Sequence, residues 1–151
     1  MTSIIHQSKT HPENRKLYNA HRILIVDDEP AILFAYRKLI EKVGMAVDIS
    51  TNLEDAVKHI RKRHYLAVIA DMRLTGTDNE DGLEFLRILR IECPATKMII
   101  ATGYGNSEIE KAAHGLGVSH FYEKPVQPSL ILGALREFHA GVACPPFAVP
   151  S

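Results

Sequence analysis

Acidic, basic and hydroxyl residues stand directly after short apolar runs of this chain. The residues with the chemistry to bind a metal ion or a phosphate group are Asp27, Asp28, Glu29, Asp71, Thr102 and Lys124. Carboxylates that converge on one point repel one another, and Mg²⁺, which prefers oxygen ligands and binds readily beside phosphate, removes that repulsion. A lysine and a hydroxyl can bind phosphoryl oxygens, and a carboxylate can be the nucleophile that forms an acyl phosphate. These residue types predict Mg²⁺-dependent phosphoryl transfer if the fold brings them together.

Short apolar runs alternate with amphipathic stretches between residues 22 and 140. The runs have strand length, and several are apolar at successive positions, as in strands buried on both faces of a parallel sheet. These expected strands are Ile23–Val26, Ala46–Ile49, Leu66–Ala70, Met98–Ala101 and Ser119–Tyr122. Helical spacing of apolar residues follows each run, over residues 32–43, 53–60, 83–89, 109–116 and 131–138. The alternation predicts an α/β fold of the (βα)5 type, a doubly wound parallel sheet covered by helices on both faces.

The candidate residues share one place in this predicted fold. Each follows the carboxyl end of an expected strand, and ligand sites of open parallel sheets lie beyond that edge. The sequence therefore predicts that the carboxylates, Thr102 and Lys124 meet at one site.

The residues Asp27-Asp28, Asp71, Thr102 and Lys124-Pro125 resemble the response regulator receiver domain of two-component signalling. The resemblance is to the single-domain type similar to chemotaxis regulators, and it covers residues 22–140. One such motif alone is weak, but this set in order, each at a strand end, is a specific signal. The resemblance implies a flavodoxin-like, five-stranded parallel sheet with strand order 2-1-3-4-5.

The resemblance also implies a role for each matching residue. Asp71 is the phosphoacceptor that takes a phosphoryl group from a phosphohistidine, and the chain is thus a phosphoprotein carrying an aspartyl phosphate. Asp28 and Asp71 bind Mg²⁺ directly, Asp27 binds it mainly through water, and the backbone carbonyl of Arg73 adds an oxygen. The other assigned residues are Lys124 and Thr102 for phosphoryl binding, Phe121 for the switch, and Arg73, Gly103 and Tyr104 for tuning of hydrolysis.

The resemblance further implies the partners of the chain. These are a sensor histidine kinase or a histidine phosphotransfer protein, and a separate downstream protein that is not identified. A homodimer through the surface of the fourth and fifth helices stays open. The chain is expected to be no enzyme beyond its own phosphorylation and dephosphorylation. The Lys124–Pro125 peptide bond is often cis in this family.

Other readings of the same residues remain open. The acidic residues 27–29 could simply stabilise the N-terminus of the first helix, Thr102 could cap the fourth, and Phe121 could belong to the core. The interval from Asp71 to Gly82 is longer than in the family pattern, and residues 75–81 lack its proline. This departure keeps a phosphorylation-independent, receiver-like scaffold as an alternative. A Mg²⁺-dependent phosphatase with an aspartyl nucleophile is less favoured, because such enzymes usually carry Asp-x-Asp after the first strand.

Composition limits the remaining classes of function. Lys plus Arg number 18 and Asp plus Glu number 18, which argues against direct nucleic-acid binding through a basic surface. No apolar run approaches a membrane span, and the N-terminus lacks a signal peptide, so we expect a cytoplasmic protein without membrane contact. Residues 1–21 are expected to form a polar tail and residues 141–151 a proline-rich tail around the domain at 22–140.

Overall fold

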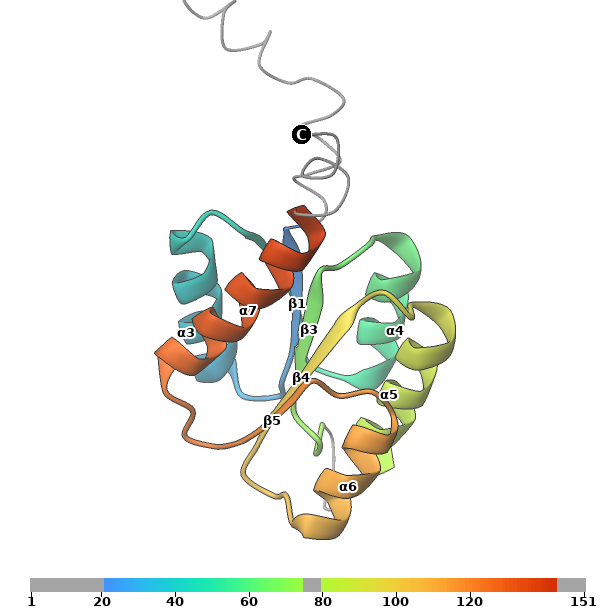
Figure 1. Cartoon of the computed structure of the whole chain (residues 1–151). Coiled ribbons are helices and arrows are strands. Elements are labelled where there is room, and N and C mark those ends of the chain that lie inside the picture. Colours follow the sequence, from blue (N-terminus) through green and yellow to red (C-terminus); the bar gives the residue numbers. More distant parts are fainter. Residues whose placement is uncertain (1–20, 75–79, 144–151) are drawn as a thin grey trace, which may run out of the picture.

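Five parallel strands form one sheet at the centre of the molecule (Figure 1). The computed structural model describes residues 21–74 and 80–143. The strands are β1 (Arg22–Val26), β2 (Ala46–Ser50), β3 (Ala67–Ala70), β4 (Lys97–Thr102) and β5 (His120–Glu123). Their order is β2-β1-β3-β4-β5, so the predicted strand order is confirmed. Each expected apolar run became a strand, with ends that differ by one residue or match.

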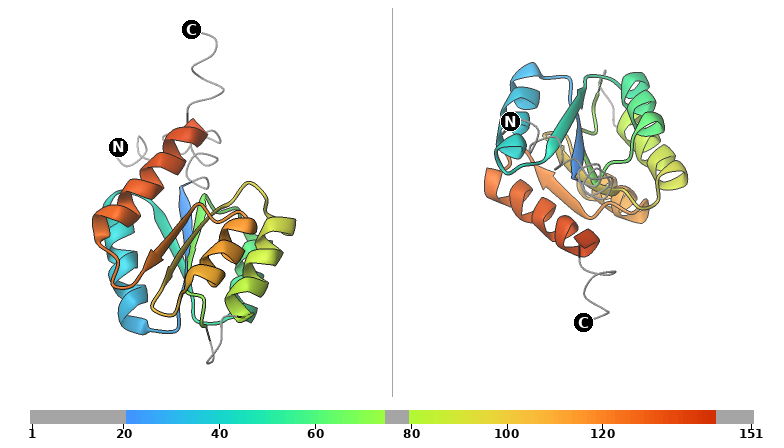
Figure 2. Two further views of the ribbon diagram at one scale, coloured as in Figure 1. Left: turned by 60° about the horizontal axis from the view of Figure 1, so that its bottom comes forward. Right: turned by 90° about the horizontal axis from the view of Figure 1, so that it is seen from above.

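Two layers of helices cover the sheet, as both views of Figure 2 show. The helices are α3 (Pro30–Lys42), α4 (Leu53–Lys62), α5 (Glu80–Glu92), α6 (Ser107–Gly115) and α7 (Pro128–Ala143). Helices α3 and α7 cover one face, and α4, α5 and α6 cover the other. Successive strand residues point to opposite faces of the sheet. Leu24 packs towards α4 and α5, whereas Ile25 packs towards α3 and α7. The predicted doubly wound α/β architecture is confirmed.

Local signals explain where the helices begin. Pro30 opens α3, where its fixed backbone angle and missing amide hydrogen do no harm. The side chain of Asn52 accepts a hydrogen bond of 2.8 Å from the amide of Asp55 and caps α4. Asn106 caps α6 in the same way, at 2.9 Å from the amide of Ile109. The alternative that Thr102 caps this helix is therefore wrong.

The expected domain boundaries stay predictions. Helix α7 runs to Ala143, and most of both expected tails lies outside the described residues. Residues 75–79, which hold most of the lengthened loop, also lie outside them. None of the helices in the described part is both long and apolar enough to cross a membrane.

Gly82 anchors the first turn of α5 to the segment that follows Asp71. Its amide donates a 3.1 Å hydrogen bond to the carbonyl of Met72, and a Cβ at this position would lie 2.6 Å from the Met72 backbone. Backbone on both sides leaves no flexible side chain to yield. Gly82 therefore fixes how closely α5 approaches the end of β3.

We predict that Gly82→Ala destabilises the fold by about 1–3 kcal/mol, because the added methyl group forces apart two packed backbone segments. The matched control is Gly133→Ala in α7, where nothing lies within 4 Å of the added atom. That substitution should raise stability by about 0.5–1 kcal/mol through helix propensity. Urea unfolding of both variants measures the difference, and equal effects of the two substitutions would contradict the close contact.

Candidate functional site

The register of the sheet brings the predicted residues to one edge. Val26 of β1 lies beside Ala70 of β3, so Asp27 and Asp71 leave neighbouring strands at the same level. The amide of Asp71 continues this ladder with a 3.0 Å hydrogen bond to the carbonyl of Val26. On the other side, the amide of Lys124 donates a 2.9 Å hydrogen bond to the carbonyl of Thr102. Strand pairing thus fixes the backbone under each of these side chains.

Lys124 is the centre of the cluster. Its Nζ atom donates hydrogen bonds of 2.6 Å to Asp27 Oδ2 and 2.9 Å to Asp71 Oδ2. A longer contact of 3.5 Å joins it to Glu29 Oε1. The sequence predicted Lys124 and the two aspartates, but it did not predict Glu29 as a partner of the lysine.

Both carboxylate oxygens of Asp71 have partners. Asp71 Oδ1 accepts a 2.8 Å hydrogen bond from the hydroxyl of Thr102 and a 3.1 Å hydrogen bond from the amide of Arg73. Asp71 and Thr102 are buried, at 2% and 0% exposure, so this arrangement is shielded from bulk water. The carboxylate is therefore fixed in position.

Charge in the cluster is unbalanced. Asp27, Asp28, Glu29 and Asp71 each offer a carboxylate oxygen, and these oxygens all lie within 4.8 Å of one another. Burial raises the pKa of Asp27, although the hydrogen bond from Lys124 opposes that rise. Burial alone would lower the pKa of Lys124, but its hydrogen bonds to Asp27 and Asp71 outweigh it, and the pKa is raised. Lys124 stays charged, but its single positive charge cannot balance the four carboxylates.

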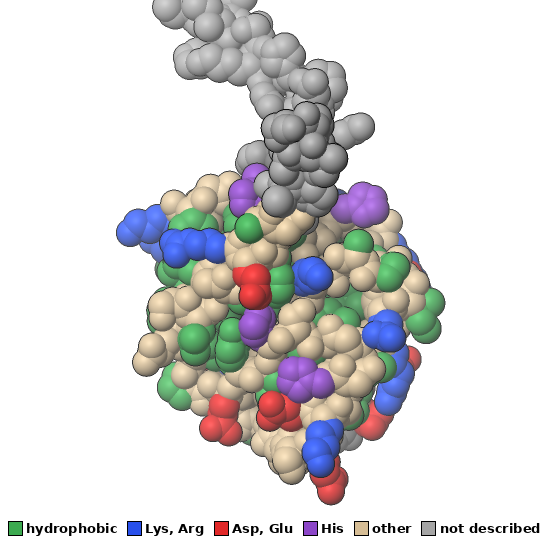
Figure 3. Space-filling model, in the orientation of Figure 1, with side chains coloured by type: hydrophobic (Ala, Val, Ile, Leu, Met, Phe, Trp, Pro, Cys, Tyr) green, Lys and Arg blue, Asp and Glu red, His purple; other side chains and the backbone are tan. Residues whose placement is uncertain are grey.

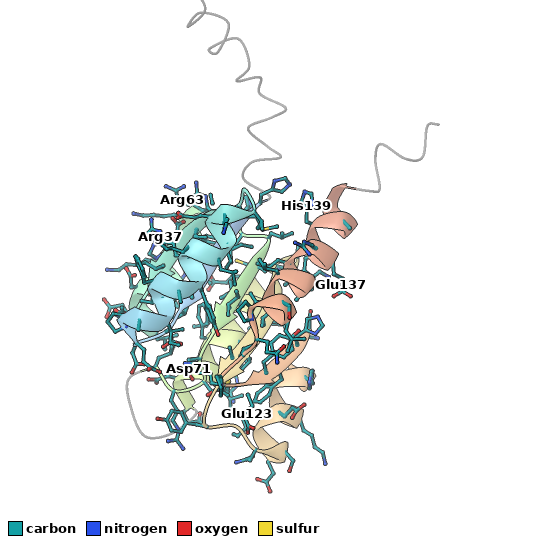
Figure 4. All side chains as sticks on the ribbon, turned by 90° about the vertical axis from the view of Figure 1, so that its left-hand side faces the viewer. Arg37, Arg63, Asp71, Glu123, Glu137 and His139 are labelled. Carbon is teal, nitrogen blue, oxygen red and sulfur yellow. The ribbon has the colours of Figure 1, made fainter. Side chains whose placement is uncertain are left out.

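The donor set suits a hard divalent cation. Carboxylate oxygens in a compact group are the ligands that Mg²⁺ takes beside phosphate. Asp28 and Glu29 are exposed while Asp27 and Asp71 are buried, so the group is open on one side. On the face that Figure 3 shows, the acidic side chains lie mostly in the lower half of the molecule, and Figure 4 places Asp71 in the lower half as well. No contact of the Arg73 carbonyl bears on its expected part in metal binding, which stays a prediction.

Arg73 and Tyr104 lie against each other beside Asp71. The guanidinium carbon of Arg73 is 4.0 Å from the centre of the Tyr104 ring. The amide of Tyr104 donates a 3.2 Å hydrogen bond to Thr102 Oγ1, which ties this residue to the cluster as well. The sequence singled out both residues for tuning, but nothing in it indicated that their side chains touch.

Phe121 packs against a glycine of the loop after β4. A Cβ atom on Gly105 would lie 2.7 Å from Cε1 and Cζ of the Phe121 ring. The ring also borders the core on the α4–α5–α6 side, so the alternative that Phe121 is partly a core residue holds for this conformation. The Lys124–Pro125 bond is cis, as the resemblance implied. Gly105 was not singled out from the sequence.

A cavity of about 640 Å³ adjoins the cluster on the side of α3. Ile32, Tyr36 and Leu39 of α3 form one wall, and the segment after Lys124 forms another. Glu29 and Lys124 border it, so it opens beside the acidic group. Tyr36 belongs to the helical pattern predicted over residues 32–43. A cavity between two elements, however, cannot be predicted from such a pattern.

Comparison with known proteins identifies proteins that are similar to this chain. The family model of the response regulator receiver domain matches residues 23–136. The nitrogen assimilation regulatory protein NtrX of Azorhizobium caulinodans is 36% identical over 106 residues, which cover 70% of this chain and 23% of that protein. The acid tolerance regulatory protein ActR of Rhizobium meliloti is 33% identical over 113 residues, which cover 75% of this chain and 57% of that protein. This chain thus matches only part of each of these longer regulators.

Solved structures agree with the family model. A CheY-like receiver domain protein from Methanospirillum hungatei superimposes with a TM-score of 0.74 at 28% identity, over 80% of this chain and 94% of the other. The beryllofluoride-activated receiver domain dimer of NtrC4 gives a TM-score of 0.73 at 25% identity, over 80% and 98% of the two chains. With the matched family model, the strand order and the residues assembled around Asp71, this chain belongs to the response regulator receiver domain family.

Proposed function

We propose that the chain is a phosphoacceptor switch in which Asp71 takes a phosphoryl group from a phosphohistidine. The donor is a sensor histidine kinase or a histidine phosphotransfer protein of a two-component system. The observation that carries the proposal is the carboxylate of Asp71, which is buried at 2% exposure and bound by Lys124, Thr102 and the Arg73 amide. A carboxylate fixed among donors that suit phosphoryl oxygens is placed to act as a nucleophile.

The chemistry follows from the contacts of the two Asp71 oxygens. Oδ2, which has Lys124 as its one hydrogen-bond partner among the described side chains, attacks phosphorus, the P–N bond breaks, and its electron pair returns to the imidazole. Lys124 and Thr102 then release the Asp71 oxygens and donate hydrogen bonds to phosphoryl oxygens. Asp27, Asp28 and Asp71 would hold Mg²⁺, which neutralises phosphoryl charge when bound. Gly103 and Tyr104, which line the adjoining cavity, and Arg73, which lies against Tyr104, would tune hydrolysis of the acyl phosphate.

The signal passes to a separate protein through a population shift. When Thr102 binds the phosphoryl group, the loop after β4 moves with it, and Phe121, whose ring packs against Gly105 of that loop, follows. The surface of α6, β5 and α7 changes as a result. A partner binds that surface, or a second copy does, since the related NtrC4 receiver forms a dimer when activated.

We predict that acetyl phosphate and Mg²⁺ add about 80 Da to the intact protein, the mass of one phosphoryl group. Asp71→Asn should show no gain, because the amide cannot form an acyl phosphate. Treatment with hydroxylamine should return the wild-type mass. Intact-mass spectrometry of both proteins is the measurement.

Other outcomes of this experiment point to other functions. No mass gain together with no binding of beryllofluoride would favour a scaffold that works without phosphate. Steady release of phosphate from several phosphomonoesters would indicate a phosphatase. Equal mass gain in Asp71→Asn would place the acceptor elsewhere.

We predict that Gly105→Ala displaces the ring of Phe121, because the new methyl group would lie 2.7 Å from two ring atoms. Fluorine NMR of protein labelled with fluorophenylalanine should show a shift of the Phe121 signal by several linewidths. Gly103→Ala is the matched control in the same loop, since nothing lies within 4 Å of its added atom. An unshifted Phe121 signal in Gly105→Ala would show that the ring does not occupy this place in solution.

A further inference from the structure

Arg73 is a cation beside an acidic cluster, yet it pairs with none of the carboxylates. Its guanidinium lies over the ring of Tyr104, at 4.0 Å from the ring centre. Its Nε atom is buried and has no hydrogen-bond partner among the described residues. A buried N–H donor without a partner is unfavourable, so its presence next to Asp71 requires an explanation.

Four contacts join Arg73 and Tyr104 to the acceptor in a closed circuit. Asp71 Oδ1 binds both the amide of Arg73, at 3.1 Å, and the hydroxyl of Thr102, at 2.8 Å. Thr102 Oγ1 in turn accepts from the amide of Tyr104 at 3.2 Å, and the two side chains close the circuit through their stacking. Any group bound to Asp71 therefore lies close to the backbone from which the Arg73 side chain starts.

A phosphoryl group would supply what the Arg73 side chain lacks. It brings three oxygens that accept hydrogen bonds and about two negative charges, and the planar guanidinium matches such oxygens with two parallel N–H donors. The donors already assigned to it, Lys124 and Thr102, come from the β4 and β5 side of the site. Arg73 follows β3 and would approach from the other side.

We propose that Arg73 is a further phosphoryl-binding residue, held on the ring of Tyr104 while Asp71 is unmodified and transferred to the phosphoryl group afterwards. The inference rests on the proposed function. The transfer is favourable because charge-assisted hydrogen bonds to phosphate are stronger than a half-exposed cation–π contact. It also gives the unpaired Nε of Arg73 an acceptor.

The transfer changes the surface beside the site. Tyr104 is 53% exposed and lines the cavity between α3 and the segment after Lys124. When Arg73 moves to the phosphoryl group, it uncovers one face of the Tyr104 ring. The ring can then rotate, and another group can contact the uncovered face. Phosphorylation thereby alters the wall of this cavity without moving any helix.

The first test is NMR of the full chain, labelled uniformly with ¹⁵N and ¹³C, with and without beryllofluoride and Mg²⁺. Beryllofluoride supplies fluorine acceptors at the positions of phosphoryl oxygens. The Nε–H signal of Arg73 should shift strongly on binding, and the ring signals of Tyr104 should shift with it. The Nε–H signal of Arg37, an exposed residue that Figure 4 places far from Asp71, should stay unchanged.

Substitutions give effects of opposite sign. Arg73→Gln removes the donor and should weaken beryllofluoride binding roughly tenfold. Tyr104→Leu removes the ring that holds Arg73 and should tighten binding by roughly threefold. The double variant should bind as weakly as Arg73→Gln, because Tyr104 acts through Arg73. Arg37→Gln is the matched arginine control and should bind like wild type.

The outcomes separate this inference from the proposed function. If beryllofluoride shifts Thr102 and Lys124 but leaves the Arg73 Nε–H signal in place, the role of Arg73 is wrong and the phosphoacceptor stands. Equal weakening by Arg73→Gln and Tyr104→Leu would mean that the stack only supports the loop, which also overturns the inference. If beryllofluoride fails to bind wild-type protein at all, both proposals are wrong.

Discussion

The arrangement of the site depends on the cost of burying the negative charges of Asp27 and Asp71. Each is about 2% exposed, and such carboxylates require a cation or several donors close by. Lys124 meets this requirement from a distant part of the sequence, with both contacts at or below 2.9 Å. A single lysine cannot offset a group that also contains Asp28 and Glu29. The residual negative charge suits the site to a divalent cation and, without one, disfavours the approach of phosphate.

The sheet converts this local requirement into a fixed geometry. Parallel pairing of β1, β3, β4 and β5 places each functional residue at or just beyond the carboxyl end of its strand. The inner strands β1, β3 and β4 are apolar between their ends, because helices cover both faces of the sheet, so charge falls at their ends, where its desolvation cost is smaller. Removal of any one strand would therefore disturb the spacing of the whole cluster. The fold and the site are specified by the same alternation of apolar runs and polar ends.

That alternation explains what could be predicted from the sequence. The five runs and the meeting of Asp27, Asp71, Thr102 and Lys124 follow from patterns local to each element, whereas the strand order was implied by the resemblance. The stacking of Arg73 on Tyr104, the seat of Phe121 at Gly105 and the cavity beside Tyr36 do not. They depend on the course of loops and on the gaps between elements, which no periodicity encodes.

The two oxygens of Asp71 show how the site can change state with little motion. Oδ1 is bound by Thr102 and the Arg73 amide, whereas Oδ2 is bound by Lys124 among the described residues. Under the proposed function, phosphorylation would remove the carboxylate charge of Asp71 and add about two negative charges on the phosphoryl group, so the site would become more negative overall. Lys124 and a divalent cation would already be engaged in balancing the unmodified cluster. A further positive group would then be needed, and an arginine held on a tyrosine ring can supply it without becoming trapped on the carboxylates beforehand.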